Sequence, residues 1–327
     1  MINVQKIKAI VESCQKESAC ELEVRYNEPM SKHSTFKVGG PADCWLRPCG
    51  DGFPAFVGSL LADSRREHIP LFILGGGANI LVADEGIRGI VLDTGGWAGE
   101  TGQRRQEGIL EFRAGTSVDD AVEIAAAAGL SGLEFLAGMP GSIGGAVWMN
   151  ARCYEREIAD VLSETEIITF SETSPSGRSP QRIRLPVNRA EFGYKRSPFQ
   201  NCDVLRANAL ILAASFQLTH GDAKMIRAEM EDHRRDREAK GHYRYPSAGS
   251  VFKNNHDFGK PSGKIIDELG LRGLQKGGAQ IAPWHGNIMV NTGGATAADI
   301  RALIDETAAR VKAATGFVLE PEILFIP

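Results

Sequence analysis

The spacing of apolar residues predicts several amphipathic helices. Val4, Ile7, Ile10 and Val11 recur every three or four positions, so residues 4–20 should form a helix with one buried face. The same criterion predicts further helices over residues 54–67, 117–128, 222–240 and 297–313.

Short apolar runs between these helices predict buried strands. They cover residues 69–74, 80–82, 89–92, 109–114, 161–170, 203–218 and 322–326, with extended segments over 29–50 and a polar loop over 171–180. Helices mixed with strands indicate an α+β or α/β protein. The change near residue 220, from Gly-rich strands to a charged helix, predicts two domains, residues 1–220 and 221–327.

Composition narrows the class of protein. The 327 residues carry 37 Lys and Arg against 41 Asp and Glu, a net charge of −4, which argues against a nucleic-acid-binding protein with a basic face. No apolar run is long enough to cross a membrane, and we see no secretion signal at residues 1–27. The six cysteines form no CxxC pair and no metal-ligand cluster, so we expect reduced thiols in a cytoplasmic protein without a bound metal.

Two glycine-rich loops are candidate anion sites, because glycine lets backbone N–H groups converge without obstruction by Cβ atoms. The first follows the strand at 69–74 and consists of Gly75, Gly76, Gly77, Ala78 and Asn79. The second lies within residues 138–146, where the candidate residues are Gly138, Pro140, Gly141, Ser142, Gly145 and Ala146. Two such loops favour a ligand with two phosphates, although each alone could be a simple turn.

Three further motifs carry reactive side chains. Ser250 lies among small residues in Pro246–Asn254, where it is either an accessible hydroxyl or a helix cap. Lys195 and Arg196 follow an aromatic residue and could bind a carboxylate or phosphate, or remain solvated. Glu320 and Glu322 precede the last predicted strand and could equally be surface charges.

A further motif, Lys32–Asp43, precedes the others. Taken in their order along the chain, from Lys32–Asp43 to Glu322, the motifs resemble those of the UDP-N-acetylenolpyruvoylglucosamine reductase family. The short connection after Phe216 resembles the family's shorter type, which lacks an extra tyrosine loop over the substrate. The resemblance implies an α+β fold with a vanillyl-alcohol-oxidase-like FAD-binding unit of two subdomains and a C-terminal α/β substrate domain. It also implies a cytoplasmic flavoprotein oxidoreductase of peptidoglycan precursor synthesis, which we expect to be monomeric.

The activity implied is that of a UDP-N-acetylmuramate dehydrogenase. NADPH reduces non-covalently held FAD, and hydride then passes to C3 of the enolpyruvyl group of UDP-N-acetylglucosamine enolpyruvate. A proton goes to C2, which gives UDP-N-acetylmuramate. The FAD pyrophosphate would lie against residues 75–79 and 138–146.

The resemblance also assigns roles to residues. Ser250 aligns with the proton donor, Glu322 with a second catalytic residue, and Tyr194, Asn254 and Gln275 with substrate-binding positions. The third catalytic residue of the family is an Arg directly after the tyrosine, where this chain has Lys195, with Arg196 one position later. We favour Lys195, because ungapped alignment places it at the position of the family's arginine and both flanks match. An extended, alternating chain here would also point the Arg196 side chain away.

Three smaller points complete the comparison. Arg152 and Asn255 stand where the family usually has a small residue and a proline, and both should be tolerated. Charge and location alone suggest that Arg237, Lys240 and Arg244 meet the UDP pyrophosphate. The alternatives are another FAD-dependent oxidoreductase or oxidase of the same fold, or a non-catalytic nucleotide-binding regulator.

Overall fold

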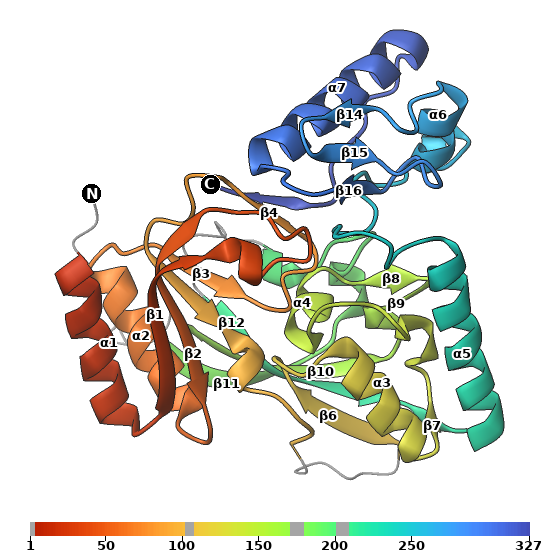
Figure 1. Ribbon diagram of the computed structural model, residues 1–327. Helices are drawn as coiled ribbons and strands as arrows, with labels where there is room; N and C mark the ends of the chain where they lie inside the picture. Colours follow the sequence, from red (N-terminus) through yellow and green to blue (C-terminus); the bar gives the residue numbers. More distant parts are fainter. Residues whose placement is uncertain (1–3, 102–107, 171–179, 201–208) are drawn as a thin grey trace. The chain divides into compact units, whose positions relative to one another are not determined.

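The computed structural model describes residues 4–101, 108–170, 180–200 and 209–327. The chain divides into two compact units (Figure 1). Unit 1 consists of the described parts of Met1–Glu28, Asp43–Gly76 and Arg88–Arg234, and unit 2 of Pro29–Ala42, Gly77–Ile87 and Arg235–Pro327. The predicted domain division at residue 220 is thus not the boundary of these units, because two N-terminal segments belong to unit 2.

Two four-stranded sheets and four helices form most of unit 1. The first sheet has the order β1-β2-β5-β3 and the second the order β11-β10-β12-β6. Their strands are β1 (Glu21–Pro29), β2 (Pro41–Cys49), β3 (Leu71–Leu74), β5 (Ile90–Asp93), β6 (Ile109–Arg113), β10 (Leu162–Phe170), β11 (Pro180–Pro186) and β12 (Ala209–Gln217). The helices are α1 (Val4–Ser18), α2 (Phe53–Arg66), α3 (Val118–Ala127) and α4 (Ile143–Trp148).

Short two-stranded pairs complete unit 1. Strand β7 (Leu130–Ser131) pairs with β13 (Thr219–His220), and β8 (Arg152–Cys153) with β9 (Arg156–Glu157). Helices α1 and α2 lie side by side, red and orange in Figure 1, and bury Ile7, Cys14, Phe56 and Leu60 in a common core. In the sequence, the division between the units falls within helix α5 (Ala223–Ala239), after Arg234.

Unit 2 is held together by a core that residues distant in sequence share. Phe36, Val38 and Leu81 pack with Ile300, Leu303 and Ile304 of helix α7 (Ala297–Thr315) in one apolar cluster. This burial explains why the two N-terminal segments belong to unit 2. Strand β4 (Ile80–Val82) pairs in parallel with β17 (Leu324–Ile326), and the other elements are α6 (Ser262–Glu268), β14 (Gln275–Lys276), β15 (Ala279–Ile281) and β16 (Met289–Asn291).

Helix α7 begins and ends with recognisable caps. Thr296 and Asp299 form a capping box, and the Asp84 carboxylate accepts hydrogen bonds from the Ala297 and Ala298 amides at 2.8 and 2.9 Å. Gly316 ends the helix with a φ of 78°. Asp84 comes from the segment that carries β4, so it also ties that segment to the C-terminal elements of unit 2.

The predicted helices are confirmed, with ends that differ by a few residues. The predicted loop over 171–180 falls mostly outside the described residues, as do residues 203–208 of the predicted strand at 203–218 and Cys202. Strand β11, helices α4 and α6 and the strands β14–β16 were not predicted.

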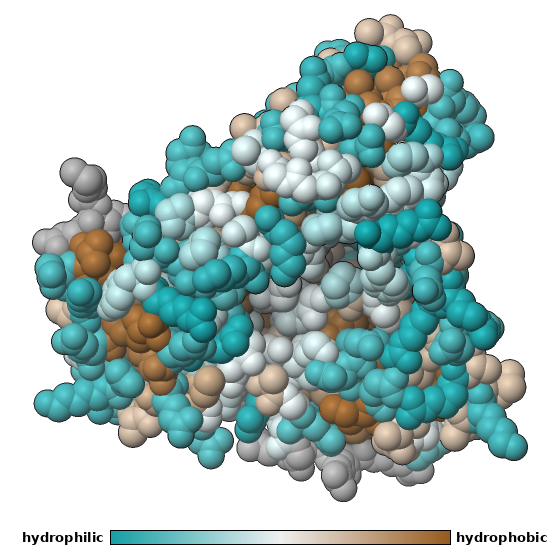
Figure 2. Space-filling view, in the orientation of Figure 1, coloured by the Kyte–Doolittle hydropathy of each residue, from teal (hydrophilic) through white to brown (hydrophobic). Residues whose placement is uncertain are grey.

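The described cysteines Cys14, Cys20, Cys44, Cys49 and Cys153 are free thiols. None of the described helices is both long and apolar enough to span a membrane. On the face shown in Figure 2, most exposed residues are hydrophilic, and the hydrophobic residues form small separate patches among them.

A buried ionic cluster lies on the second sheet of unit 1. The Arg184 guanidinium contacts Glu111 at 2.6 Å, Glu164 at 2.8 Å and Glu166 at 3.1 Å. Burial alone would raise the pKa of the Glu111 carboxyl, but hydrogen bonds from Arg184, Thr101 and Ser215 hold that pKa below its ordinary value. Arg184 is therefore the cation that permits three carboxylates to lie on one sheet.

We predict that Arg184→Met destabilises the protein by about 2–3 kcal/mol, because it leaves buried carboxylates unpaired. Arg182→Met is the matched control, since that side chain is 52% exposed and its pair with Glu166 should contribute less than about 1 kcal/mol. Because its pKa is lowered in the folded protein, the Glu111 carboxylate stabilises the fold above its unfolded-state pKa near 4 and loses this contribution as the pH falls. Thermal melting should therefore show a Tm gap between wild type and Arg184→Met that is widest at pH 7 and narrows below pH 4. An equal gap for Arg182→Met would contradict the assignment.

Candidate active site

The two glycine-rich loops meet in unit 1. A Cβ atom added to Gly76 would lie 2.6 Å from the Gly141 Cα, so the two loops pack backbone against backbone. Gly141 has a φ of 128°, which a residue with a side chain rarely adopts. The sequence motifs at 75–76 and 141–142 thus form one structural feature rather than two separate turns.

Unpaired backbone donors gather where the loops meet. Within the described parts of the chain, the amides of Gly75, Gly76, Gly141 and Ser142 donate no hydrogen bond. The Ser142 hydroxyl accepts from the Gly145 amide at 3.3 Å and so caps the start of α4. Open N–H groups at a glycine turn are suited to phosphate oxygens, so the loops fit a pyrophosphate group.

Other residues of these loops have different environments. Gly145 and Pro140 are exposed, whereas Ala146 is buried in the apolar core of unit 1. Gly138 has a φ of 72°, and its amide donates to the Asp119 carboxylate at 2.9 Å. Gly145 can therefore face a ligand, while Ala146 contributes packing.

Residues 77–79 of the first loop belong to unit 2. Gly77 has a φ of 63°, and a Cβ there would lie 2.0 Å from the His33 carbonyl oxygen. The Asn79 side chain donates to the Glu322 carbonyl at 3.1 Å, and the Asn79 carbonyl accepts from the Leu324 amide at 3.0 Å. Asn79 therefore fixes the backbone on both sides of Ile323.

Unit 2 brings the Ser250 and Glu322 segments together. The Glu322 amide donates to the Val251 carbonyl at 2.7 Å, and Phe252 forms an antiparallel bridge with Pro321. Ser250 bridges Ile288 on its other side, so it lies in an extended segment rather than at a helix cap. Its half-buried hydroxyl makes no hydrogen bond to any residue that the structure describes. A hydroxyl without a structural role is available to a reacting molecule.

The two predicted substrate residues of unit 2 are both exposed. Asn254 accepts a hydrogen bond from the Ser262 amide at 3.0 Å, beside the start of α6. The Gln275 side chain donates to the Gly277 carbonyl at 2.9 Å. These contacts orient both side chains on the surface of unit 2.

Tyr194 and Lys195 occupy a tight turn in unit 1. The Gly193 amide donates to the Arg196 carbonyl at 2.9 Å, and the Arg196 amide donates back to the Gly193 carbonyl at 3.0 Å. Lys195 has a φ of 55°, at a position in the turn where glycine or asparagine is usual. The expectation of an extended, alternating chain at 194–196 is therefore wrong, because these reciprocal hydrogen bonds close a turn.

The turn also changes the comparison between the two cations. Lys195 is half-buried and Arg196 is exposed. The Arg152 guanidinium lies 5.6 Å from the centre of the Tyr194 ring and is paired with Glu155 at 2.7 Å.

The three cations proposed for the UDP pyrophosphate have different environments. Lys240 is paired with Asp236 at 2.6 Å, Arg244 lies over the Trp284 ring, and Arg237 is buried.

Three residues outside the predicted set hold these segments in place. Asn287 is buried and exchanges two hydrogen bonds with the Phe252 backbone, next to the Ser250 segment. Asn150 and Gln200 donate to carbonyls of the Tyr194 turn. An asparagine within an apolar run, as in Val147–Ala151 and Asn287–Val290, is the sequence signal that could have revealed two of them.

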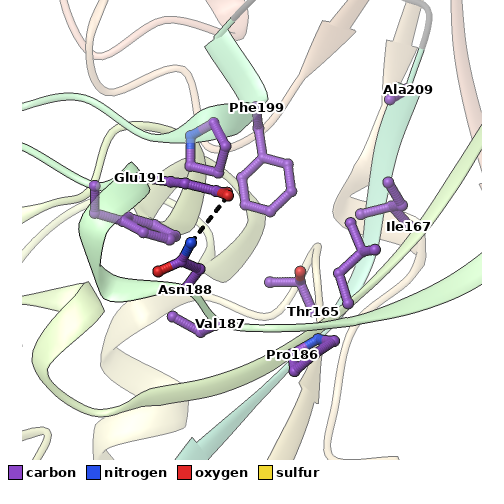
Figure 3. A pocket seen from close by; sticks show the side chains of 11 residues that line it. Thr165, Ile167, Pro186, Val187, Asn188, Glu191, Phe199 and Ala209 are labelled. Carbon is purple, nitrogen blue, oxygen red and sulfur yellow. Dashed lines mark hydrogen bonds between the residues drawn. The ribbon is translucent and has the colours of Figure 1, made fainter.

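A cavity of about 300 Å³ lies elsewhere in unit 1, lined by β10, β11, residues 187–199 that follow β11, and Ala209 at the start of β12 (Figure 3). Its lining is mostly apolar and includes Ile167, Val187 and Phe199, with Asn188 donating to Glu191 at 3.1 Å. Among the described residues that line it there is no cation, and none of them is a predicted site residue. We therefore do not place the phosphate-bearing ligands there.

Comparison with known proteins matches two parts of the chain to family models. Residues 241–326 match the family model for the C-terminal domain of UDP-N-acetylenolpyruvoylglucosamine reductase, and residues 55–173 match that for an FAD binding domain. The second match contains both Gly76 and Gly141. The first contains Ser250 and Glu322.

Whole-chain relatives lead to the same family. The UDP-N-acetylenolpyruvoylglucosamine reductase of Treponema denticola is 38% identical over 92% of this chain and 93% of its own length. That of Borreliella burgdorferi is also 38% identical, over 91% of this chain and 92% of its own. The crystal structure of the Thermus caldophilus enzyme superposes with a TM-score of 0.70 at 32% identity, covering 94% of this chain and all of that one. The predicted α+β fold with a flavin-binding part is thereby confirmed.

We predict that Gly145→Val lowers the flavin content of the purified protein, whereas the flavin-free forms of the variant and the wild type have similar Tm values. A Cβ at Gly145 would meet no protein atom closer than the Ser142 Oγ at 3.4 Å, so the protein itself has room for a side chain. Any loss must then come from a ligand that occupies this space. Absorbance of flavin released on denaturation measures the content, and full flavin occupancy would show that the cofactor does not approach Gly145.

Proposed function

Because the chain belongs to the UDP-N-acetylenolpyruvoylglucosamine reductase family, we propose that it reduces UDP-N-acetylglucosamine enolpyruvate to UDP-N-acetylmuramate with FAD and NADPH. The observation that carries the catalytic assignment is the hydrogen bond from the Glu322 amide to the Val251 carbonyl at 2.7 Å. It brings the Ser250 and Glu322 segments side by side within unit 2. Neither rival reading, a flavin oxidase or a regulator, accounts for this pair together with the family match.

The unpaired amides of Gly75, Gly76, Gly141 and Ser142 would hold the FAD pyrophosphate. Backbone donors fixed by close loop packing bind the phosphates without reorganising. When bound, FAD supplies hydride transfer from NADPH and then to C3 of the enolpyruvyl group. The remaining steps belong to side chains of this chain.

Ser250 is the proposed proton donor to C2 of the substrate. Hydride addition at C3 leaves negative charge on C2, shared with the neighbouring carboxylate, and this species is basic enough to take a proton from a hydroxyl. The Ser250 hydroxyl has no partner among the described residues, so donation breaks no structural hydrogen bond. Glu322 lies on the adjoining segment, where its carboxyl group would relay a proton from water to the Ser250 oxygen and so restore the hydroxyl.

A cation on the Tyr194 turn would stabilise the developing charge. Lys195 is our first choice, since it aligns with the family's arginine and is less exposed than Arg196. Its ammonium offers a point charge for the substrate carboxylate rather than the bidentate fork of a guanidinium. Tyr194, Asn254 and Gln275 would contribute further substrate contacts.

The wider assignments are also part of the proposal. We place the enzyme in the cytoplasm as a monomer of the family's shorter type, acting in peptidoglycan precursor synthesis without nucleic-acid or membrane partners. We retain the two-domain division of residues 1–220 for FAD and 221–327 for substrate as a functional division.

Ser250→Ala should separate the two half-reactions. Flavin reduction by NADPH requires no proton at C2 and should keep its wild-type rate, whereas reoxidation by the enolpyruvyl substrate should slow by about 10²–10⁴-fold. Stopped-flow absorbance of the flavin follows each half separately. Ser247→Ala, a serine of the same segment, is the control and should alter neither rate. Equal slowing of both halves in Ser250→Ala would contradict the role.

The two candidate cations can be separated in the same assay. Lys195→Met should slow substrate-driven reoxidation by about 10²–10³-fold, because it removes the charge opposite the carboxylate. Lys195→Arg should retain activity, and Arg196→Met should be much milder. If Arg196→Met is inactive while Lys195→Met turns over normally, Arg196 is the catalytic cation instead.

A further inference from the structure

The backbone of the Tyr194 turn is fixed by two amide side chains. Asn150 donates to the Gly193 carbonyl at 2.8 Å, and Gln200 donates to the Lys195 carbonyl at 3.2 Å. Left-handed backbone is unfavourable for a lysine, so Lys195 keeps its φ of 55° only if its surroundings enforce it. The two donors act on the carbonyls that flank Tyr194 and Lys195.

Asn150 is itself completely buried, with an exposed fraction of 0%. Its carboxamide is used at both ends, because the oxygen accepts from the Ala159 amide at 3.1 Å while the nitrogen donates to Gly193. Its φ of 43° is a conformation that asparagine adopts more readily than most residues. Both the side chain and the backbone at this position therefore favour asparagine.

Helix α4 connects this anchor to the glycine-rich loop. Ser142 caps the first turn of α4, and the helix ends at Trp148, two residues before Asn150. The Trp148 carbonyl accepts from the Ser197 hydroxyl at 2.6 Å and from Gln200 at 2.8 Å. One short helix thus has the loop at its start and the supports of the turn at its end.

We propose that Asn150 is a positioning residue for the reduction of the substrate. It sets where the Tyr194 turn presents its cation, and α4 fixes that turn relative to the loop at Gly141 and Ser142. This inference rests on the proposed function, since it takes Lys195 to be the cation that meets the substrate carboxylate. Asn150 itself need not touch the substrate.

Asn150→Asp isolates the contact with the turn. The aspartate keeps an acceptor for the Ala159 amide and tolerates the same backbone conformation, but it replaces the donor to the Gly193 carbonyl with an oxygen. We expect flavin content and reduction by NADPH to stay within about twofold of wild type. Substrate-driven reoxidation should slow by up to about 100-fold, because small displacements of a catalytic group have effects of that size.

A double-mutant cycle with Lys195→Met distinguishes positioning from general damage. If Asn150 acts through Lys195, Asn150→Asp should cost little more once Lys195 is methionine, and the two effects will not add. Asn188→Asp is the matched control, because Asn188 is an exposed asparagine of the same unit that caps a short turn. It should leave both half-reactions unchanged.

The proposal is overturned if Asn150→Asp reoxidises at the wild-type rate, slows both half-reactions equally, or adds its full effect to that of Lys195→Met. Should Asn150→Asp fail to fold, Gln200→Glu removes the donor to the Lys195 carbonyl at a half-buried site and must show the same pattern. Failure of the proposed function is a separate result, since the wild-type flavin would then not be reoxidised by the enolpyruvyl substrate.

Discussion

The candidate flavin site depends on two stretches of backbone that lie closer together than any side chain would allow. Gly76 and Gly141 pack with no room for a Cβ between them, and in the described structure their amides and those of Gly75 and Ser142 donate no hydrogen bond. A residue with a side chain at position 76 would push the loops apart and separate these donors. Because Gly141 precedes the cap of α4, the same contact fixes where α4 begins. The position of the Tyr194 turn, at the other end of α4, follows from it.

In both units, the reactive side chains lie on segments that other polar groups hold in place. Asn287 and Asn79 fix the Ser250 and Glu322 segments in unit 2, and Asn150 and Gln200 fix the Tyr194 turn in unit 1. Each support pairs a side-chain amide with a backbone carbonyl. Asn150 and Asn287 are buried and use both their donor and their acceptor, so they tolerate few replacements.

Local sequence predicts those parts of the fold whose stability is local. The apolar spacing of α1 and α7 and the two glycine-rich loops were identifiable because their patterns depend on near neighbours. Strand β11 was not, since its alternating arginines become compatible with a sheet only when Glu111 and Glu166 lie opposite them. The Tyr194 turn was misread for a related reason. Its lysine has a glycine-like backbone in a turn whose carbonyls accept from Gln200 and from Asn150, and Asn150 lies more than forty residues earlier in the chain.

Unit 2 contains a pairing that spans most of the polypeptide. Strand β4 at Ile80–Val82 pairs in parallel with β17 at Leu324–Ile326, and Leu81 is buried in the same core as Leu303. During synthesis on a ribosome, β4 therefore emerges long before its partner exists. Contacts between residues so far apart form slowly, and an unpaired apolar strand is prone to aggregate. The nascent chain must therefore carry β4 without its partner strand until β17 has been synthesised, so the burial of this edge comes late in folding.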